Sequence, residues 1–101
     1  MTTPPIACTL DPQALAAQRD ELLPGLVEQA VEHRPLADGS AWRFTDAPGR
    51  LEQIARVIDR ERCCCRFLAF RLVAMPEGGA LWLEVTGPPG TPEMLRTLLA
   101  P

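Results

Sequence analysis

The sequence predicts an α+β domain in which a four-stranded, mainly antiparallel sheet carries about three helices on one face. Two observations support this prediction: alternating apolar and polar segments occur in two pairs joined by turns, and each pair is followed by a segment with helical apolar spacing. Hairpins that alternate with helices favour one sheet with the helices packed on one side. A length of 101 residues is typical of one domain, so we expect residues 1–101 to form a single globular unit.

The first element is a helix predicted over residues 10–23. Asp11 stands where an N-cap is expected, and Pro12 follows at the first helical position, where a missing N–H costs nothing. We expect Pro24 and Gly25 to end or kink this helix.

The first hairpin is predicted by Asp38-Gly39, a strong turn dipeptide. The stretch that follows it, "SAWRFT", has both aromatic residues on one face and predicts a strand over residues 40–45. The stretch before it is ambiguous, because Val27 and Val31 fit a helix as well as a strand. We interpret residues 26–36 as the partner strand.

The clearest helix is predicted for "DAPGRLEQIARVIDRERCCC", with Pro48 and Gly49 at its start. One stripe along this helix is expected to face the core, with Val57 beside it. The expected members of the stripe are Leu51, Ile54, Ala55, Ile58 and Arg62.

A second hairpin and a final helix complete the domain. Residues 67–75 and 80–86 alternate in polarity around a loop rich in proline and glycine, so we expect them to pair. For the final helix, residues 91–100, we expect Thr91 as N-cap and Pro92 at the first position.

Composition limits the possible functions. The net charge of −3 does not predict a nucleic-acid partner, and no apolar run approaches the ~18 residues of a membrane span. The start "MTTPPIACTL" does not look like a secretory signal. We therefore expect a cytosolic protein, with all four cysteines as free thiols, because three of them are contiguous rather than spaced as in a disulfide framework.

The stretch "RERCCCRF" is the strongest chemical signal in the chain. If the helix continues to this point, Cys64 and Cys65 lie on or beside its buried stripe and Cys63 lies on the solvent side. Because the following segment is a strand, the chain must turn between residues 63 and 66. Such a corner can direct two or three sulfurs into one pocket.

The charges around the block favour a soft metal ion over nucleophilic catalysis. The helix C-terminus disfavours a thiolate, whereas Arg60, Arg62 and Arg66 favour one. A bound metal ion resolves this conflict, since it deprotonates a coordinating thiol outright. Thiolates select Cu(I) and Zn(II), and Hg(II) or trivalent arsenic would also suit two or three sulfurs.

The remaining polar and aromatic candidates are weaker. His33 is the only histidine and is expected at the surface of a strand. Glu32 and Glu61 are expected to be solvated, since no paired carboxylate spacing supports an acid–base role. Trp42 and Trp82 are expected to pack in the sheet or to cover its open face.

Three stretches carry a resemblance to a family of short bacterial proteins: "IACTL" (6–10), "ERCCCRFLAFRL" (61–72) and "LWLEVTGPPGT" (81–91). The family pattern is E-R-x-C-C-x-F-x-x-F-x-L, followed by a strand that ends in T-G-P-x-G. The resemblance implies that Cys64 and Cys65 are the paired cysteines and that Cys8 is an N-terminal family cysteine. Arg66 stands where relatives often have proline. Some members are similar to small proteins found near metal- or mercury-responsive regulators, which favours a role in heavy-metal resistance.

The leading hypothesis is a small cytosolic thiol protein, not an enzyme, that sequesters or relays a soft metal ion. The expected ligands are Cys64 and Cys65, with Cys8 as third sulfur and Cys63 as an auxiliary thiol. We expect no organic cofactor and no nucleic-acid or membrane partner. The sequence is compatible with a homodimer. One alternative is a cysteine-based redox enzyme or sensor, in which one cysteine attacks and a neighbour resolves the product. Another is a non-catalytic interaction domain that dimerises through sheet edges or its tryptophan face.

Overall fold

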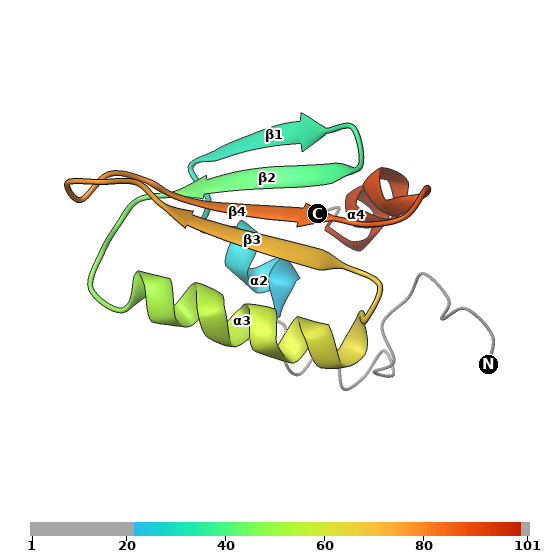
Figure 1. Cartoon of the computed structure of the whole chain (residues 1–101), viewed down its shortest axis with the longest axis horizontal. Helices are drawn as coiled ribbons and strands as arrows, with labels where there is room; N and C mark the ends of the chain where they lie inside the picture. Colours follow the sequence, from blue (N-terminus) through green and yellow to red (C-terminus); the bar gives the residue numbers. More distant parts are fainter. Residues whose placement is uncertain (1–21, 100–101) are drawn as a thin grey trace.

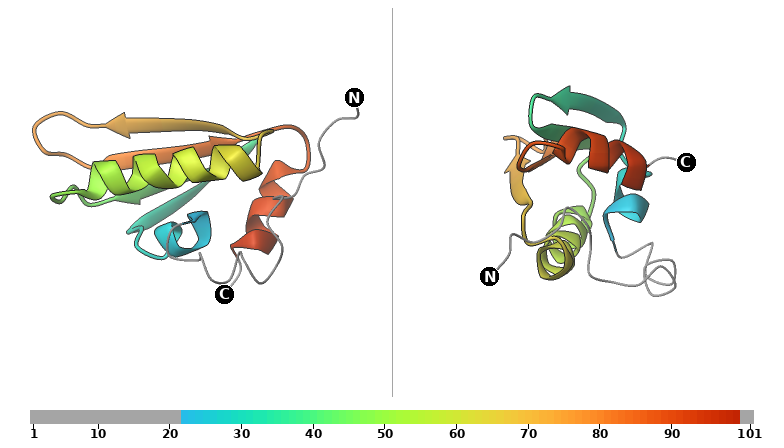
Figure 2. Two further views of the ribbon diagram at one scale, coloured as in Figure 1. Left: turned by 90° about the horizontal axis from the view of Figure 1, so that it is seen from below. Right: turned by 90° about the vertical axis from the view of Figure 1, so that its right-hand side faces the viewer.

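The structure, a computed structural model, describes residues 22–99 as a sheet with helices on one side (Figure 1). The described elements, in chain order, are α2 (Leu23–Val27), β1 (Glu32–Leu36), β2 (Gly39–Phe44), α3 (Arg50–Cys64), β3 (Ala69–Ala74), β4 (Leu81–Thr86) and α4 (Thr91–Leu98). The predicted fold class is confirmed: two hairpins form one antiparallel sheet, and α2, α3 and α4 gather on one side of it (Figure 2). The helix predicted over residues 10–23 falls almost wholly outside the described residues.

The two hairpins join through their second strands, which gives the strand order β1-β2-β4-β3. In this register Trp42 lies opposite Leu83, and Leu72 lies opposite Leu83 from the other side. Because side chains alternate along a strand, this row faces the helices, whereas Trp82 and its neighbours face away from them. The inward residues of β4 are buried, as the alternation predicted.

The core lies between the helix-covered face of the sheet and the three helices. All three helices contribute to it, together with both central strands. Its buried members are Leu23, Leu26, Trp42, Phe44, Ile54, Val57, Cys65, Leu68, Leu81, Leu83, Val85 and Leu95.

The strand predicted over residues 26–36 is too long at its start, because the chain first forms the short helix α2. Leu22, Leu23 and Leu26 are all buried, and the last two have the i, i+3 spacing of one helix face. Pro24 lies in the first turn of α2, where proline is tolerated. It therefore starts a helix here, and whether it also ends the helix predicted before it lies outside the described residues. Only residues 32–36 pair as the strand β1.

Helix α3 forms where predicted, but its buried face is rotated from the predicted stripe. Gly49 precedes it with φ of 80°, a conformation that suits glycine. The buried residues of α3 are Ile54, Val57 and Glu61, whereas Leu51 is 45% exposed. Ala55 and Arg62, also assigned to the stripe, are exposed.

Helix α4 is preceded by Gly90, with φ of 100°, so Thr91 is not the N-cap that we expected. Thr91 is the first helical residue, and its hydroxyl donates a hydrogen bond to the Pro88 carbonyl at 2.7 Å. The "GPPG" stretch forms a turn between β4 and α4. Among residues 22–99, no helix has the length and apolar character needed to cross a bilayer.

Candidate functional site

The three contiguous cysteines lie in three different environments at the C-terminal end of α3. Cys63 is exposed, Cys64 is half-buried against the core, and Cys65 is 0% exposed. Successive helical residues are about 100° apart, which separates the first two side chains. This order of exposure confirms the placement predicted from the helix register.

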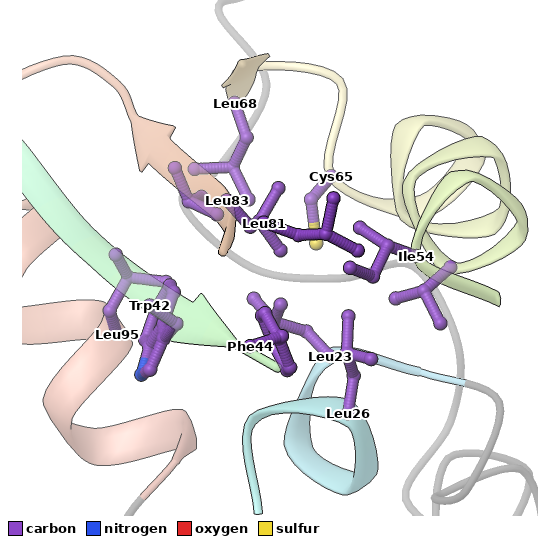
Figure 3. Close-up of a cluster of buried hydrophobic side chains, with 12 residues drawn as sticks. Leu23, Leu26, Trp42, Phe44, Ile54, Cys65, Leu68, Leu81, Leu83 and Leu95 are labelled. Carbon is purple, nitrogen blue, oxygen red and sulfur yellow. The ribbon is translucent and has the colours of Figure 1, made fainter. Parts of the chain in front are cut away.

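Cys65 ends the helix and turns into the core. Its N–H still donates a helical hydrogen bond to the Glu61 carbonyl, but its φ and ψ of −119° and 72° are no longer helical. Its own carbonyl accepts a hydrogen bond from Leu68 N–H at 3.1 Å, which tightens the corner before β3. In Figure 3 the Cys65 sulfur is directed among the side chains around Leu81 and Ile54.

The oxidation state differs along the block. Cys63 and Cys64 are free thiols, whereas Cys65 is disulfide-bonded. The prediction of free thiols is thus confirmed for two of the cysteines and wrong for Cys65. Cys8 lies outside the described residues, so its approach to the block stays a prediction.

Glu61 is the residue that sequence reasoning placed wrongly, because it is buried and only 2% exposed. Its Oε2 atom accepts a hydrogen bond from Leu23 N–H at 2.8 Å, across 38 residues of sequence. Leu23 opens α2, and Leu22 before it supplies no side-chain cap. Glu61 therefore satisfies one of the unpaired N–H groups at the start of that helix.

The other carboxyl oxygen of Glu61 lies beside the buried sulfur. Its Oε1 atom is 3.7 Å from Cys65 Sγ, one helical turn further along the chain. A disulfide sulfur has no proton, so in this state the carboxyl is the group that can donate. Burial raises the pKa of Glu61, and the Leu23 hydrogen bond opposes this shift. The raised pKa favours the protonated carboxyl, which can donate to sulfur.

The helical spacing of α3 indicated that Glu61 is buried, since Glu61 lies seven residues after the buried Ile54 and four after Val57. Residues at this spacing share a helix face. The prediction that Glu61 is solvated was wrong because it followed from the polar side chain alone, whereas the position of Glu61 on the buried face of α3 decides its burial.

Cys63 lies at a separate surface hollow. The described residues that line this hollow are Asp59, Arg62, Cys63, Arg66 and Leu68. The Cys63 thiol donates a weak hydrogen bond to the Asp59 carbonyl at 3.5 Å. Two arginines thus flank an exposed thiol, outside the buried environment of Cys65.

Residues 22–99 contain no group of three or more His, Cys, Asp or Glu side chains arranged to hold a metal ion. The three sulfurs of the block do not form such a group. His33 is an exposed residue of β1, as expected, with Nε2 3.0 Å from Ser40 Oγ and its ring stacked on Trp42.

The remaining candidates have structural partners. Glu32 accepts hydrogen bonds from Arg34 and Arg43 at 2.6 and 2.8 Å, and these arginines lower the pKa of its carboxyl. It is ion-paired, which the expectation of a merely solvated carboxylate did not include. Trp42 is buried in the core, and Trp82 carries the Arg34 guanidinium over its ring at 4.7 Å.

The chain matches no protein family model, no curated protein and no solved structure.

Proposed function

We propose that the protein is a cysteine-based redox protein in which Cys65 alternates between a thiol and a disulfide, with Glu61 as its proton donor and acceptor. The observation that carries this proposal is the contact at the end of α3: a fully buried, disulfide-bonded sulfur lies 3.7 Å from a buried carboxyl group. Titratable groups with a perturbed pKa cluster at functional sites, and burial raises the pKa of Glu61.

The partner in this disulfide is proposed to be Cys8. The sequence has four cysteines, and Cys63 and Cys64 are free. Pairing with Cys8 ties the N-terminal segment to the corner between α3 and β3. Reduction would release that tie, which gives the redox change a structural consequence.

Each proposed step is a thiol–disulfide exchange, in which one S–S bond forms as another breaks. For reduction, the thiolate of a small thiol attacks the sulfur bonded to Cys65, the disulfide breaks, and Cys65 leaves as a thiolate. Protonated Glu61 gives its proton to that thiolate. A second small thiol then attacks the mixed disulfide, so that the protein gains two electrons while two small thiols become one small disulfide.

Burial of Cys65 decides which sulfur is attacked. At 0% exposure, Cys65 Sγ is inaccessible to a reductant, so the partner sulfur is the target and Cys65 is the leaving group. A leaving thiolate inside the core lacks water to stabilise it, and a carboxyl proton at 3.7 Å supplies the stabilisation. In the reducing cytosol expected from the sequence, such a disulfide would be transient and would serve catalysis or sensing.

The proposal is tested by equilibrating the full-length protein in glutathione buffers of graded ratio and trapping free thiols with a maleimide. One two-electron transition is expected for the wild type. It should persist in Cys63→Ser and Cys64→Ser and disappear in Cys65→Ser. A protein whose four cysteines remain reduced at every ratio would refute the proposal.

Soft-metal binding is the second candidate, and the same bond favours it. Two sulfurs close enough to form a disulfide are also close enough, once reduced, to share a thiophilic ion such as Hg(II) or Cu(I). Under this alternative Cys65 and Cys8 are the primary ligands, and the free, half-buried Cys64 is a further candidate.

Native mass spectrometry of the reduced protein separates the two functions. Ion capture predicts one retained Hg(II), Cu(I) or Zn(II) ion in the wild type, lost in Cys65→Ser and kept in Cys63→Ser. The redox function predicts a reversible disulfide with no retained ion after exchange into buffer that contains a competing small thiol.

A further inference from the structure

A cavity of about 690 Å³ is lined by residues of α2, the first hairpin and α4, and by the segment between α2 and β1. This volume lies in the range of small-molecule sites. Trp42 lies against the helices, and Val31 near the cavity mouth is 55% exposed. The described apolar lining residues are Val27, Ala30, Val31, Trp42, Leu95 and Leu99.

A small polar group interrupts this apolar lining. His33 Nε2 lies 3.0 Å from Ser40 Oγ, and the imidazole stacks on Trp42 with ring centroids 5.4 Å apart. Stacking fixes the imidazole plane at the wall of the cavity. The pair can offer either a donor or an acceptor to a ligand, because both groups can exchange these roles.

Arg96 supplies a positive charge that can reorient towards a ligand. It lines the cavity from α4, and its side chain is 69% exposed. Its ion pair with Glu93 is long, at 3.9 Å, and exposed pairs of this kind are worth little. Binding an anion in the cavity would therefore cost Arg96 only a weak contact.

The described acidic residues that line the cavity are Glu28 and Glu32, and both have partners within the protein. The Glu32 carboxylate is held by Arg34 and Arg43, at 2.6 and 2.8 Å. Glu28, exposed at the end of α2, also has a partner of its own. Arg96 is the lining residue whose printed ion pair is long and exposed, which favours a negatively charged ligand over a cationic one.

We propose that this cavity binds a small amphipathic carboxylate. The alkyl chain lies against the apolar walls above Trp42, the carboxylate pairs with Arg96, and the His33–Ser40 pair hydrogen-bonds the polar end. None of the described residues that line the cavity is a cysteine, so this proposal does not depend on the redox proposal. Octanoate is the probe, with octanol and octylamine as uncharged and cationic molecules of the same chain length.

The test follows the backbone amide signals of the ¹⁵N-labelled full-length protein during titration with each probe. Octanoate should give saturable shifts that cluster at Val31, Ser40, Leu95 and Leu99, and should bind more tightly than octanol and octylamine. The residues of β3 should not respond, since they line no part of the cavity.

Substitutions at Arg96 and Val31 test the carboxylate contact. Arg96→Gln should weaken octanoate about two- to fivefold and leave octanol unchanged, as expected for one exposed ion pair. Arg71→Gln is the matched control, because Arg71 is equally exposed on the opposite face of the sheet. At the exposed position 31, Val31→Glu should weaken octanoate and Val31→Lys should strengthen it, whereas Met75→Glu should do neither.

Three results would each overturn the proposal. They are the absence of saturable shifts below the micelle concentration of octanoate, octylamine binding as tightly as octanoate, or equal octanoate affinity in Arg96→Gln and the wild type. Because Val31 and Arg96 are exposed, these variants should fold, and their unchanged amide spectra without ligand confirm it.

Discussion

At the scale of single residues, Glu61 is the most informative side chain of this protein. One of its oxygens accepts the Leu23 N–H and the other lies beside Cys65, so the same carboxyl group joins α2, α3 and the buried sulfur. A buried carboxylate without such contacts would be costly. The contact with Leu23 gives it a structural role in capping, and the contact with Cys65 is the basis of the proposed chemical role. These two roles make different predictions.

The chemical role predicts that Glu61→Gln slows reduction of the Cys65 disulfide. Glutamine keeps an oxygen for Leu23 N–H but has no acidic proton for the leaving thiolate. We expect a decrease of about tenfold or more in the rate of reduction by a small thiol near neutral pH, since general acids contribute at least that much. Stopped-flow measurement of thiol release gives the rate. Glu52→Gln, on the exposed face of α3, should react like the wild type.

The raised pKa of Glu61 also predicts how stability changes with pH. In the folded protein the carboxyl binds its proton more tightly than in the unfolded chain, where its pKa is about 4.3. The free energy of unfolding contributed by this group is therefore highest below pH 4.3 and falls as the pH rises through the folded-state pKa.

Glu61→Gln lacks this dependence, so the stability difference between variant and wild type should shift in favour of the variant as pH rises through that window. Urea unfolding at a series of pH values measures it. A constant difference across the window would contradict the raised pKa.

At the scale of elements, the register of α3 controls both the core and the cysteine site. Ile54 is fully buried and Leu51 is 45% exposed, although both were assigned to the apolar stripe from the sequence. Ile54→Ala should cost about 2–5 kcal/mol of unfolding free energy, and Leu51→Ala well under 1 kcal/mol. Chemical denaturation compares them. Equal losses would place the buried face where the sequence stripe predicted it.

The pairing of β2 with β4 predicts a second effect at this scale. A side chain at Gly39 would place its Cβ 2.8 Å from the Val85 carbonyl carbon, closer than nonbonded atoms approach. Gly39→Ala should therefore cost about 2–3 kcal/mol, as a steric clash in the core does. Gly78→Ala meets no neighbour and should cost about 1 kcal/mol, from its φ of 71° alone. The reverse order in thermal unfolding would contradict this strand register.

These elements also show what the sequence could predict. The Asp38-Gly39 turn and the strand after it were sufficient for the first hairpin, and alternation around the proline- and glycine-rich loop was sufficient for the second, where the inward residues of β4 are apolar and buried. The start of β1 was not predictable in this way, since residues 26–31 fit both periods and tertiary burial of Leu26 selected the helix. The exposure order of the cysteines followed from helical geometry. The Glu61–Cys65 contact did not, because it also depends on α2 meeting α3.

At the scale of the whole molecule, the proposed redox change of the Cys65 disulfide predicts a change in stability. A crosslink that closes a long loop typically adds about 2–4 kcal/mol, so the reduced protein should unfold at a lower denaturant concentration than the oxidised one. The comparison requires unfolding curves with and without a phosphine reductant. Cys65→Ser should resemble the reduced wild type and be insensitive to the reductant, whereas Cys63→Ser should behave as the wild type. Equal stability in both states would show that the crosslink has no structural consequence.

The most direct test of the central claim maps the thiols of the oxidised protein. Free thiols are blocked with a maleimide in denaturant, and trypsin then releases the segment from Cys63 to Arg66, since arginines precede and end it. We predict that its fragment spectrum shows label on the first two cysteines, with the third linked to the peptide that contains Cys8. Three labelled cysteines in that segment, before any reductant is added, would contradict the account.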